Sequence, residues 1–199
     1  NLTPEQRNDP YRAARMGSFK SFSDGSLGSR SAKLYTDYAD DPGNTGILVI
    51  SPEDLAKRMY KAYRHGLQPA THCIGDKALE VTLDAVEYCL EQGLKDGMTP
   101  EEQAKRLPFR IIHAQMATPE LIERMKKLPI VLDIQPTFLM TDLHWIEERV
   151  GKERAVLSYP WKTYLDAGLI MAGGSDAPVE SFNPWIGIYA TVTRQDMDG

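Results

Sequence analysis

Hydrophobic and polar positions follow two alternating patterns along the chain. Short apolar stretches predict strands, and stretches with apolar residues at helical spacing predict amphipathic helices. The predicted strands, the first and last with their exit loops, lie at 19–26, 67–75, 109–115, 130–138 and 169–178. The predicted helices lie at 51–66, 76–93, 99–106, 118–128, 160–168 and 183–195. Strands and helices therefore alternate along nearly the whole chain.

Capping residues mark the ends of several predicted helices. Ser51 suits the cap of the helix that follows it, Pro52 its first turn, and Gly66 its end. Thr99 and Glu102 stand three positions apart, as in a capping box, and indicate a helix start there. These helix predictions thus rest on local signals as well as on periodicity.

The alternation also constrains the sheet. Strands joined by crossover helices run parallel, because a tight hairpin can join only antiparallel strands. The predicted strands are apolar at nearly every position, as in sheets covered on both faces. The pattern predicts an α/β fold, and it fits an open doubly wound sheet and a barrel equally well.

Composition narrows the class of protein. The chain has 199 residues, of which 42% are hydrophobic and 26% charged, so it is expected to fold rather than to be disordered. A net charge of −5 argues against nucleic-acid binding, and no run of about 18 apolar residues predicts a membrane span. The start of the sequence lacks the apolar core of a secretory signal, which favours a cytoplasmic location. Cys73 and Cys89 are too few for a disulfide framework and are expected to be buried thiols.

Four chemically active residues stand where predicted strands end. They are Lys20, His72, His113 and Asp176. In parallel α/β folds the active site lies at the carboxyl ends of the strands. Each of these residues alone is more often structural, but four at equivalent strand ends favour one shared site. Each of these residues can bind a metal ion.

Five motifs carry a resemblance to a known family. They read FKSFSDGSLGSRSA, THCIGDKAL, RIIHAQ, IQPTF and GGSDAPVESFNPWIGIYATVTRQ, in that order, between about residues 16 and 195. Together they resemble the YtcJ-like branch of the amidohydrolase superfamily, often called amidohydrolase family 3, near which N-substituted formamide deformylase also belongs. The combination is highly specific, although each motif alone is weak.

The resemblance implies a metal-dependent TIM barrel that hydrolyses carbon–nitrogen bonds other than peptide bonds. It implies that Lys20, on barrel strand four, is carboxylated and bridges two metal ions. His72 and His113 match the ligands of strands five and six, and Asp176 matches the strand-eight aspartate, which binds metal and shuttles a proton. Lys20 and Asp176 are then the catalytic residues. An uncarboxylated Lys20 is a poor ligand, because an ammonium group has no lone pair.

The resemblance also implies a small-molecule substrate, an amide or a formamide. Asp24 and Arg30 in the DGSLGSR loop, and Gln135 after the fourth predicted strand, are the candidate substrate-binding residues. Two positions depart from the family pattern. Ile112 stands where the family's EHAQ motif has glutamate, and Phe138 where its QPTH motif has histidine. The second change removes a candidate substrate contact at the pocket mouth.

A third departure concerns how much of a barrel is present. The His-x-His pair that the superfamily carries on strand one does not occur in the sequence. We therefore expect residues 1–199 to form a partial barrel domain with strands four to eight, without strands one to three and the flanking β domain. A complete barrel takes about 250 residues. Such a segment has open edges, so we expect either pairing with a second copy or a longer parent protein of which this chain is a fragment. We also expect weak or single-metal occupancy and little activity of this chain alone.

A rival hypothesis from another class is a non-catalytic module derived from a barrel, which binds a ligand or a partner. The missing His-x-His pair favours it. Stoichiometric zinc that is lost on replacing Lys20 or His113 would favour the hydrolase instead. A phosphate-binding barrel is a weaker third hypothesis, because GGSDAP places an acid where an anion site needs hydrogen-bond donors.

Overall fold

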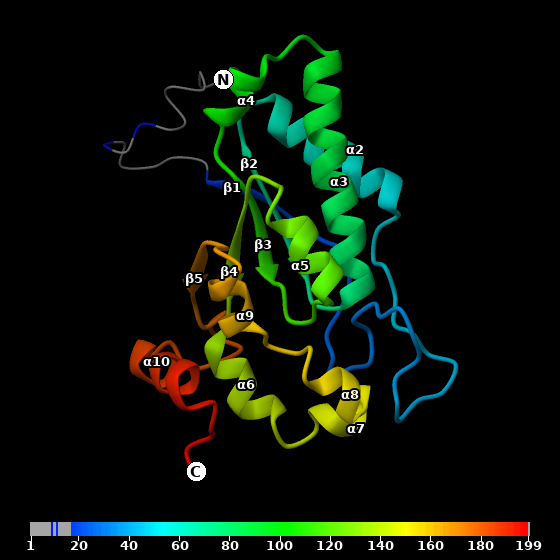
Figure 1. The fold of residues 1–199 in the computed structure, drawn as a ribbon, viewed down its shortest axis with the longest axis vertical. Coiled ribbons are helices and arrows are strands. Elements are labelled where there is room, and N and C mark those ends of the chain that lie inside the picture. The colour runs from blue at the N-terminus through cyan, green and yellow to red at the C-terminus, as the bar shows by residue number, and fades with distance from the viewer. Residues whose placement is uncertain (1–8, 10, 12–16, 199) are drawn as a thin grey trace.

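The computed structural model describes residues 9, 11 and 17–198 and contains a five-stranded parallel sheet (Figure 1). The strands are β1 (Ser18–Phe22), β2 (Gln68–Cys73), β3 (Phe109–His113), β4 (Ile130–Ile134) and β5 (Met171–Gly173). They pair in chain order, and every neighbouring pair is parallel. Strands in chain order are the arrangement of a barrel wall, whereas the order reverses at a switch point in a doubly wound sheet. The topology therefore decides the alternative that the sequence pattern leaves open.

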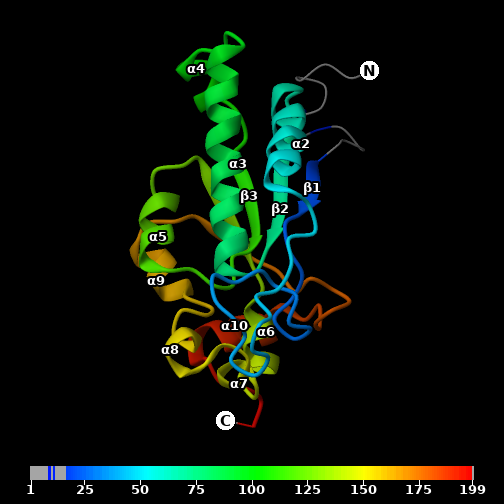
Figure 2. The same ribbon diagram turned by 90° about the vertical axis from the view of Figure 1, so that its right-hand side faces the viewer.

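Helices cover one face of this sheet and close one of its ends. They are α2 (Pro52–Arg64), α3 (Asp76–Lys95), α4 (Pro100–Ala104), α5 (Pro119–Met125), α6 (Pro136–Asp142), α7 (Ile146–Val150), α8 (Lys152–Ala155), α9 (Trp161–Asp166) and α10 (Pro184–Thr193). Helices α2 and α3 pack on each other, and each contacts β2 (Figure 2). Helices α6, α7, α8 and α10 lie beyond the carboxyl ends of the strands (Figure 1).

The capping predictions are confirmed. Ser51 accepts a hydrogen bond from the Asp54 backbone N–H at 3.1 Å, at the start of α2. The Thr99 hydroxyl accepts from the Glu102 backbone N–H while the Glu102 carboxylate accepts from the Thr99 N–H, which completes a capping box at α4. Short polar signals therefore set these helix starts.

The chain departs from the predicted elements after β4. The predicted strand over 130–138 ends at Ile134, and helix α6 begins at Pro136. Proline is favoured in the first turn of a helix, since its fixed φ suits the helix and its missing N–H has no partner to lose. Two short helices, α7 and α8, follow where the sequence predicts a loop. The apolar run of β4 continues into α6, which is why periodicity alone does not separate the two.

The two faces of the sheet differ in polarity. Toward the helices, β3 places Phe109 and Ile111, which are buried. On the opposite face, the Arg110 guanidinium donates to Asp133 on β4 at 2.7 Å and to the Ser18 hydroxyl on β1 at 3.0 Å. The expectation of apolar residues at nearly every strand position is wrong for this second face, because alternate residues of a strand point to opposite sides.

Helix α3 is the longest element, and its buried side faces the sheet. Leu79, Leu83 and Val86 lie on that side and are fully buried. Charged residues occupy its other side, so the helix is amphipathic. Within the described ranges, no helix combines the length and apolar character needed to cross a membrane.

Candidate metal centre

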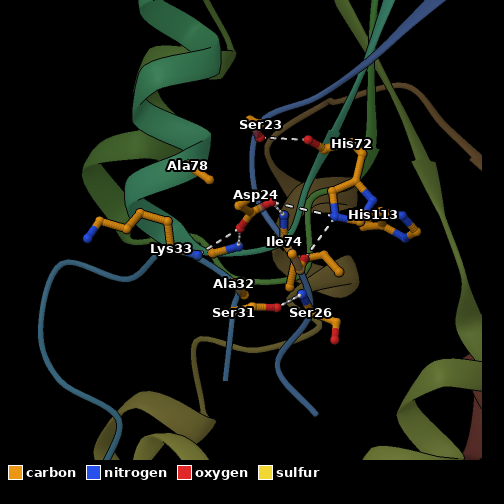
Figure 3. A network of polar contacts seen from close by, with 12 residues as sticks. Ser23, Asp24, Ser26, Ser31, Ala32, Lys33, His72, Ile74, Ala78 and His113 are labelled. Carbon is orange, nitrogen blue, oxygen red and sulfur yellow. Dashed lines mark hydrogen bonds and ion pairs between the residues drawn. The ribbon is translucent and has the colours of Figure 1, made fainter. Parts of the chain in front are cut away.

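The candidate site lies at the carboxyl edge of the sheet, on the face opposite the helices. Strand pairing places Lys20 beside Ala70 of β2, and His72 is two positions further along the same face. His113 is the last residue of β3, with a left-handed φ of 77°. The rings of His72 and His113 meet edge to face, with centroids 4.5 Å apart (Figure 3). Asp176 follows β5 in an exposed turn.

The tautomer of His72 follows from its hydrogen bond. Its Nε2 lies 2.9 Å from the carbonyl oxygen of Gly25. A carbonyl oxygen only accepts hydrogen bonds, so Nε2 carries the proton and donates it. The lone pair of the neutral ring is then on Nδ1, which is the atom that can bind a metal ion.

The tautomer of His113 is set in the same way by Gln135. The Gln135 side-chain N–H donates to the Asp133 carbonyl at 3.0 Å, which orients its amide. Its Oε1 therefore accepts from His113 Nδ1, at 2.6 Å. The lone pair of His113 is consequently on Nε2. A carbonyl-type acceptor behind a histidine is the arrangement that orients metal-binding imidazoles.

Both imidazoles are held in the neutral form. Burial, reinforced by the charges of His72 and Lys20, lowers the pKa of His113 to about 3. Burial also lowers the pKa of His72, and Lys20 adds to this effect while Asp176 opposes it. The pKa of Lys20 is lowered by burial too, although Asp176 and Asp133 raise it. Burial thus favours the neutral form of both histidines, so that each ring keeps one free lone pair.

The low pKa of His113 predicts how stability depends on pH. Its folded pKa of about 3 is below the ordinary histidine value of 6.5, so its stabilising contribution is complete above pH 6.5 and is lost as the pH falls toward 3. Each pH unit in that window is worth about 1.4 kcal/mol. Urea unfolding of the metal-free protein should therefore show a shallower loss of stability between about pH 7 and about pH 5 for His113→Asn than for the wild type.

Comparing the wild type with His113→Asn isolates the contribution of His113 to the pH dependence of stability. Burial raises the pKa of Asp24 and of Asp142 to about 6, so these acids add stability as the pH falls, but they do so in both proteins. His144, an exposed histidine paired with Asp196 at 3.1 Å, is the control position. Equal slopes for the wild type and His113→Asn would contradict the prediction.

Asp24 holds the loop after β1 against the end of β2 (Figure 3). It is 2% exposed, and its oxygens accept from the backbone N–H groups of Lys33 at 2.9 Å, Ile74 at 3.1 Å and Gly75 at 2.8 Å. It also lies 3.6 Å from His72 Nε2. In the structure, the Asp24 carboxylate therefore positions the loop and the histidine. Its contact with a substrate stays a prediction.

Gly75 makes that close approach of backbones feasible. A Cβ at this position would lie 2.0 Å from the Lys33 carbonyl oxygen. Because that oxygen belongs to the backbone, it cannot move aside as the end of a flexible side chain could. Glycine is therefore required where the loop crosses the start of α3.

The other two predicted substrate-binding residues also have partners within the protein. The Arg30 guanidinium donates to both carboxylate oxygens of Asp40, at 3.0 and 2.8 Å, and Arg149 contacts the same carboxylate. Gln135 is 7% exposed and holds His113. Their substrate-binding roles stay predictions, and the structure adds a positioning role for Gln135.

The predicted packing of the two cysteines is confirmed. Cys73 and Cys89 are both buried and free. Cys73 follows His72 on β2 and therefore points to the opposite face. Its thiol pKa is raised by burial, which keeps it protonated and removes it from the set of metal ligands.

Two residues near the centre make contacts that the sequence does not predict. Phe138 stacks on the His113 ring, with centroids 5.7 Å apart. Asp142 accepts hydrogen bonds from Gln115 at 3.0 Å and from the Tyr159 hydroxyl. Neither contact joins neighbours in sequence, and no local pattern signals them. The substitution of phenylalanine for the family's histidine at 138 is the one signal that draws attention to this position.

The donor set fits a metal ion only in part. His72 Nδ1 and His113 Nε2 are lone-pair nitrogens on neighbouring neutral rings, which suits zinc and similar ions. Among residues 9, 11 and 17–198, no three His, Cys, Asp or Glu side chains are arranged to hold a metal ion. The described residues therefore provide two candidate nitrogen ligands, and the predicted metal-binding roles of Lys20 and Asp176 stay predictions.

A parallel sheet in chain order, with two neutral histidines and a lysine near its carboxyl edge, is typical of hydrolase barrels that use a metal ion. Comparison with known proteins agrees with this class. The chain belongs to the amidohydrolase family, whose model matches residues 2–199.

Individual relatives lead to the same family and fold. The chain is 40% identical over 192 residues to YtcJ of Bacillus subtilis (strain 168), covering 96% of this chain and 34% of that protein. It is 39% identical to Protein LONG AFTER FAR-RED 3 of Arabidopsis thaliana, over 90% of this chain and 29% of the relative. The crystal structure of an uncharacterized metal-dependent hydrolase from Pyrococcus horikoshii OT3 matches with a TM-score of 0.79 and 36% identity, covering 97% of this chain and 38% of that one. The chain thus spans about a third of the length of these relatives, and the predicted fold class, part of a TIM barrel, is confirmed.

Proposed function

We propose that this chain contributes to a metal-dependent hydrolase that cleaves carbon–nitrogen bonds of small non-peptide amides with activated water. The observation that carries the proposal is the histidine pair, in which each ring is neutral and donates its one proton to an oxygen acceptor. A neutral imidazole whose N–H is held by an oxygen acceptor is oriented to bind a metal ion through its other nitrogen. Membership of the amidohydrolase family and the likeness to a metal-dependent hydrolase support the same reading.

The proposal assigns a role to each residue of the site. His72 and His113 hold a divalent ion, zinc in our proposal, which supplies Lewis-acid activation of water when bound. Lys20 joins them after carboxylation, and its lowered pKa favours the uncharged amine that such a reaction needs. Asp176 accepts a proton from the attacking water and returns it to the leaving amine. Asp24, Arg30 and Gln135 remain the proposed substrate-side residues.

The test is the release of amine from N-substituted formamides and N-acyl amino acids, measured with zinc present. We expect slow release that a chelator abolishes and added Zn²⁺ restores, with less release from His113→Ala than from the wild type. The rate is expected to be low because the His-x-His pair is not in this sequence. Amine release that is unchanged by the chelator, or that is equal in His113→Ala and the wild type, would contradict the proposal.

The second candidate function is a non-catalytic module that binds a ligand. It is favoured by the finding that no three His, Cys, Asp or Glu side chains of the described chain are set to hold a metal ion. Ligand binding without any amine release would support it. In the sheet described here, β1 and β5 are edge strands. We propose that two copies associate through these edges, which light scattering tests.

A further inference from the structure

A small cavity adjoins the histidine pair on the side of α6, and we call it the α6 cavity. Its volume is about 190 Å³, which suits an end group of a small molecule rather than a whole one. Segments that follow β1, β2, β3 and β5 line it together with α6 and the start of α7. Phe138 links it to the candidate metal centre, because its ring lines the cavity and stacks on His113.

One wall of the α6 cavity is apolar. Leu27 and Ile74 are buried and line it from the loops after β1 and β2. Phe138 and Trp145 add two aromatic rings, and Val179 completes the wall from the segment after β5. A wall of this kind binds an aliphatic or aromatic stem through burial of apolar surface.

The other wall carries two carboxylates. Asp142 and Glu180 both line the cavity, and the Thr141 hydroxyl donates to Glu180 at 2.9 Å. Burial, with a smaller contribution from the negative charge of Glu180, raises the pKa of Asp142 to about 6, although hydrogen bonds from Tyr159, Gln115 and Thr141 oppose the shift. Near pH 7.5 Asp142 is therefore an ionised, poorly solvated carboxylate whose charged neighbour has the same sign. A bound cation would relieve this unfavourable arrangement.

Gln115 lies next to the carboxylate wall and holds Asp142 in place. Gln115 lines the cavity and is 3% exposed, and its side-chain nitrogen donates to Asp142 and to Tyr159. Its Oε1 accepts no hydrogen bond from any described residue. Solvent does not reach this oxygen, so the groups that a ligand can meet at this wall are the carboxylates of Asp142 and Glu180.

We propose that the α6 cavity binds the cationic end of a small ligand, an ammonium or amidinium group on an apolar stem. The stem lies against the apolar wall, and the N–H groups meet the carboxylates of Asp142 and Glu180. If the proposed hydrolase function holds, this ligand is a substrate whose amide carries such a group near the scissile bond. The binding itself does not require a metal ion.

The test uses the full chain treated with a chelator at about pH 7.5, so that metal binding plays no part. Benzylammonium is the cationic probe, benzyl alcohol its neutral counterpart and benzoate the anionic one, and NMR titration measures their dissociation constants. Benzylammonium should bind at least about 10-fold more tightly than benzyl alcohol, and benzoate should not bind. Glu180→Gln and Asp142→Asn should each weaken benzylammonium binding by about 10-fold.

Control variants keep the test decisive. Glu153→Gln changes an exposed acid of α8 and should leave binding unchanged. Circular dichroism reports folding. If Asp142→Asn disturbs the contacts with Gln115 and Tyr159, the binding measured for Glu180→Gln decides the test. Equal binding of benzyl alcohol and benzylammonium, no binding of benzylammonium, or unchanged binding in Glu180→Gln would overturn the proposal. Because no metal is present, these outcomes are independent of whether amide hydrolysis is found.

Discussion

Zinc affinity should fall by more than about 100-fold when His113 is replaced by alanine. The residue supplies one of the two lone-pair nitrogens at the centre of the site, at a ring-centroid distance of 4.5 Å from His72. Loss of a group that only orients a metal ligand costs about 10- to 100-fold in metal affinity, so loss of the ligand itself should cost more. Competition with a chromophoric zinc chelator measures this change.

Gln135 provides an intermediate case for the same measurement. Gln135→Ala removes the oxygen that fixes the His113 tautomer through the 2.6 Å hydrogen bond, but it leaves the ligand nitrogen in place. We expect a loss of about 10- to 100-fold for this variant. His144→Ala, at an exposed histidine, should bind zinc like the wild type. Equal zinc affinity in His113→Ala and His144→Ala would exclude the histidine pair as the metal site.

The position of the site could be predicted because it depends only on where strands end. Parallel strands share one carboxyl edge, so Lys20, His72 and His113 converge as soon as the strand boundaries and direction are known. Alternation then selects the face for Lys20 and His72, whereas His113 is in register with Cys73 and has a left-handed φ of 77°, which the strand pattern does not predict. The same reasoning applies to the burial of Cys73.

The support around the site could not be predicted, because its contacts join distant parts of the chain. Asp24 accepts from backbone N–H groups 50 and 51 positions away, at Ile74 and Gly75. An aspartate in a glycine-rich loop has the appearance of a turn residue or a pocket residue, and no local pattern reveals backbone partners at that distance. The hydrogen bond from His113 to Gln135 depends on a loop geometry of the same non-local kind.

The start of α6 illustrates a third limit, set by ambiguous periodicity. IVLDIQPTF reads as one apolar stretch, yet Ile134 is the last strand residue and Gln135 has non-helical backbone angles before α6. The break at this point turns Gln135 toward His113 and Phe138 onto its ring. A short apolar run does not separate strand from helix, because both bury such residues. The error in one element boundary therefore hides two contacts of the site.

Asp24→Ala should be among the most destabilising substitutions in the protein, by about 3 to 5 kcal/mol. It would leave three backbone N–H groups, those of Lys33, Ile74 and Gly75, without an acceptor in a buried position. Each unsatisfied buried donor costs about 1 to 3 kcal/mol, part of which water entering the vacated space offsets. Urea unfolding with an unchanged m-value measures the difference, since m reports the surface exposed on unfolding.

The matched control is Asp166→Ala, at an exposed aspartate paired with Lys162, where we expect a change below about 0.5 kcal/mol. Asp24→Asn separates hydrogen bonding from shape: it keeps the volume but turns an N–H₂ group toward backbone donors, so it should lose nearly as much stability as the alanine variant. If Asp24→Asn were as stable as the wild type, the three backbone hydrogen bonds would not be what secures the loop. The loop after β1 would then have to be held by its other contacts, among them the pairing of Arg30 with Asp40.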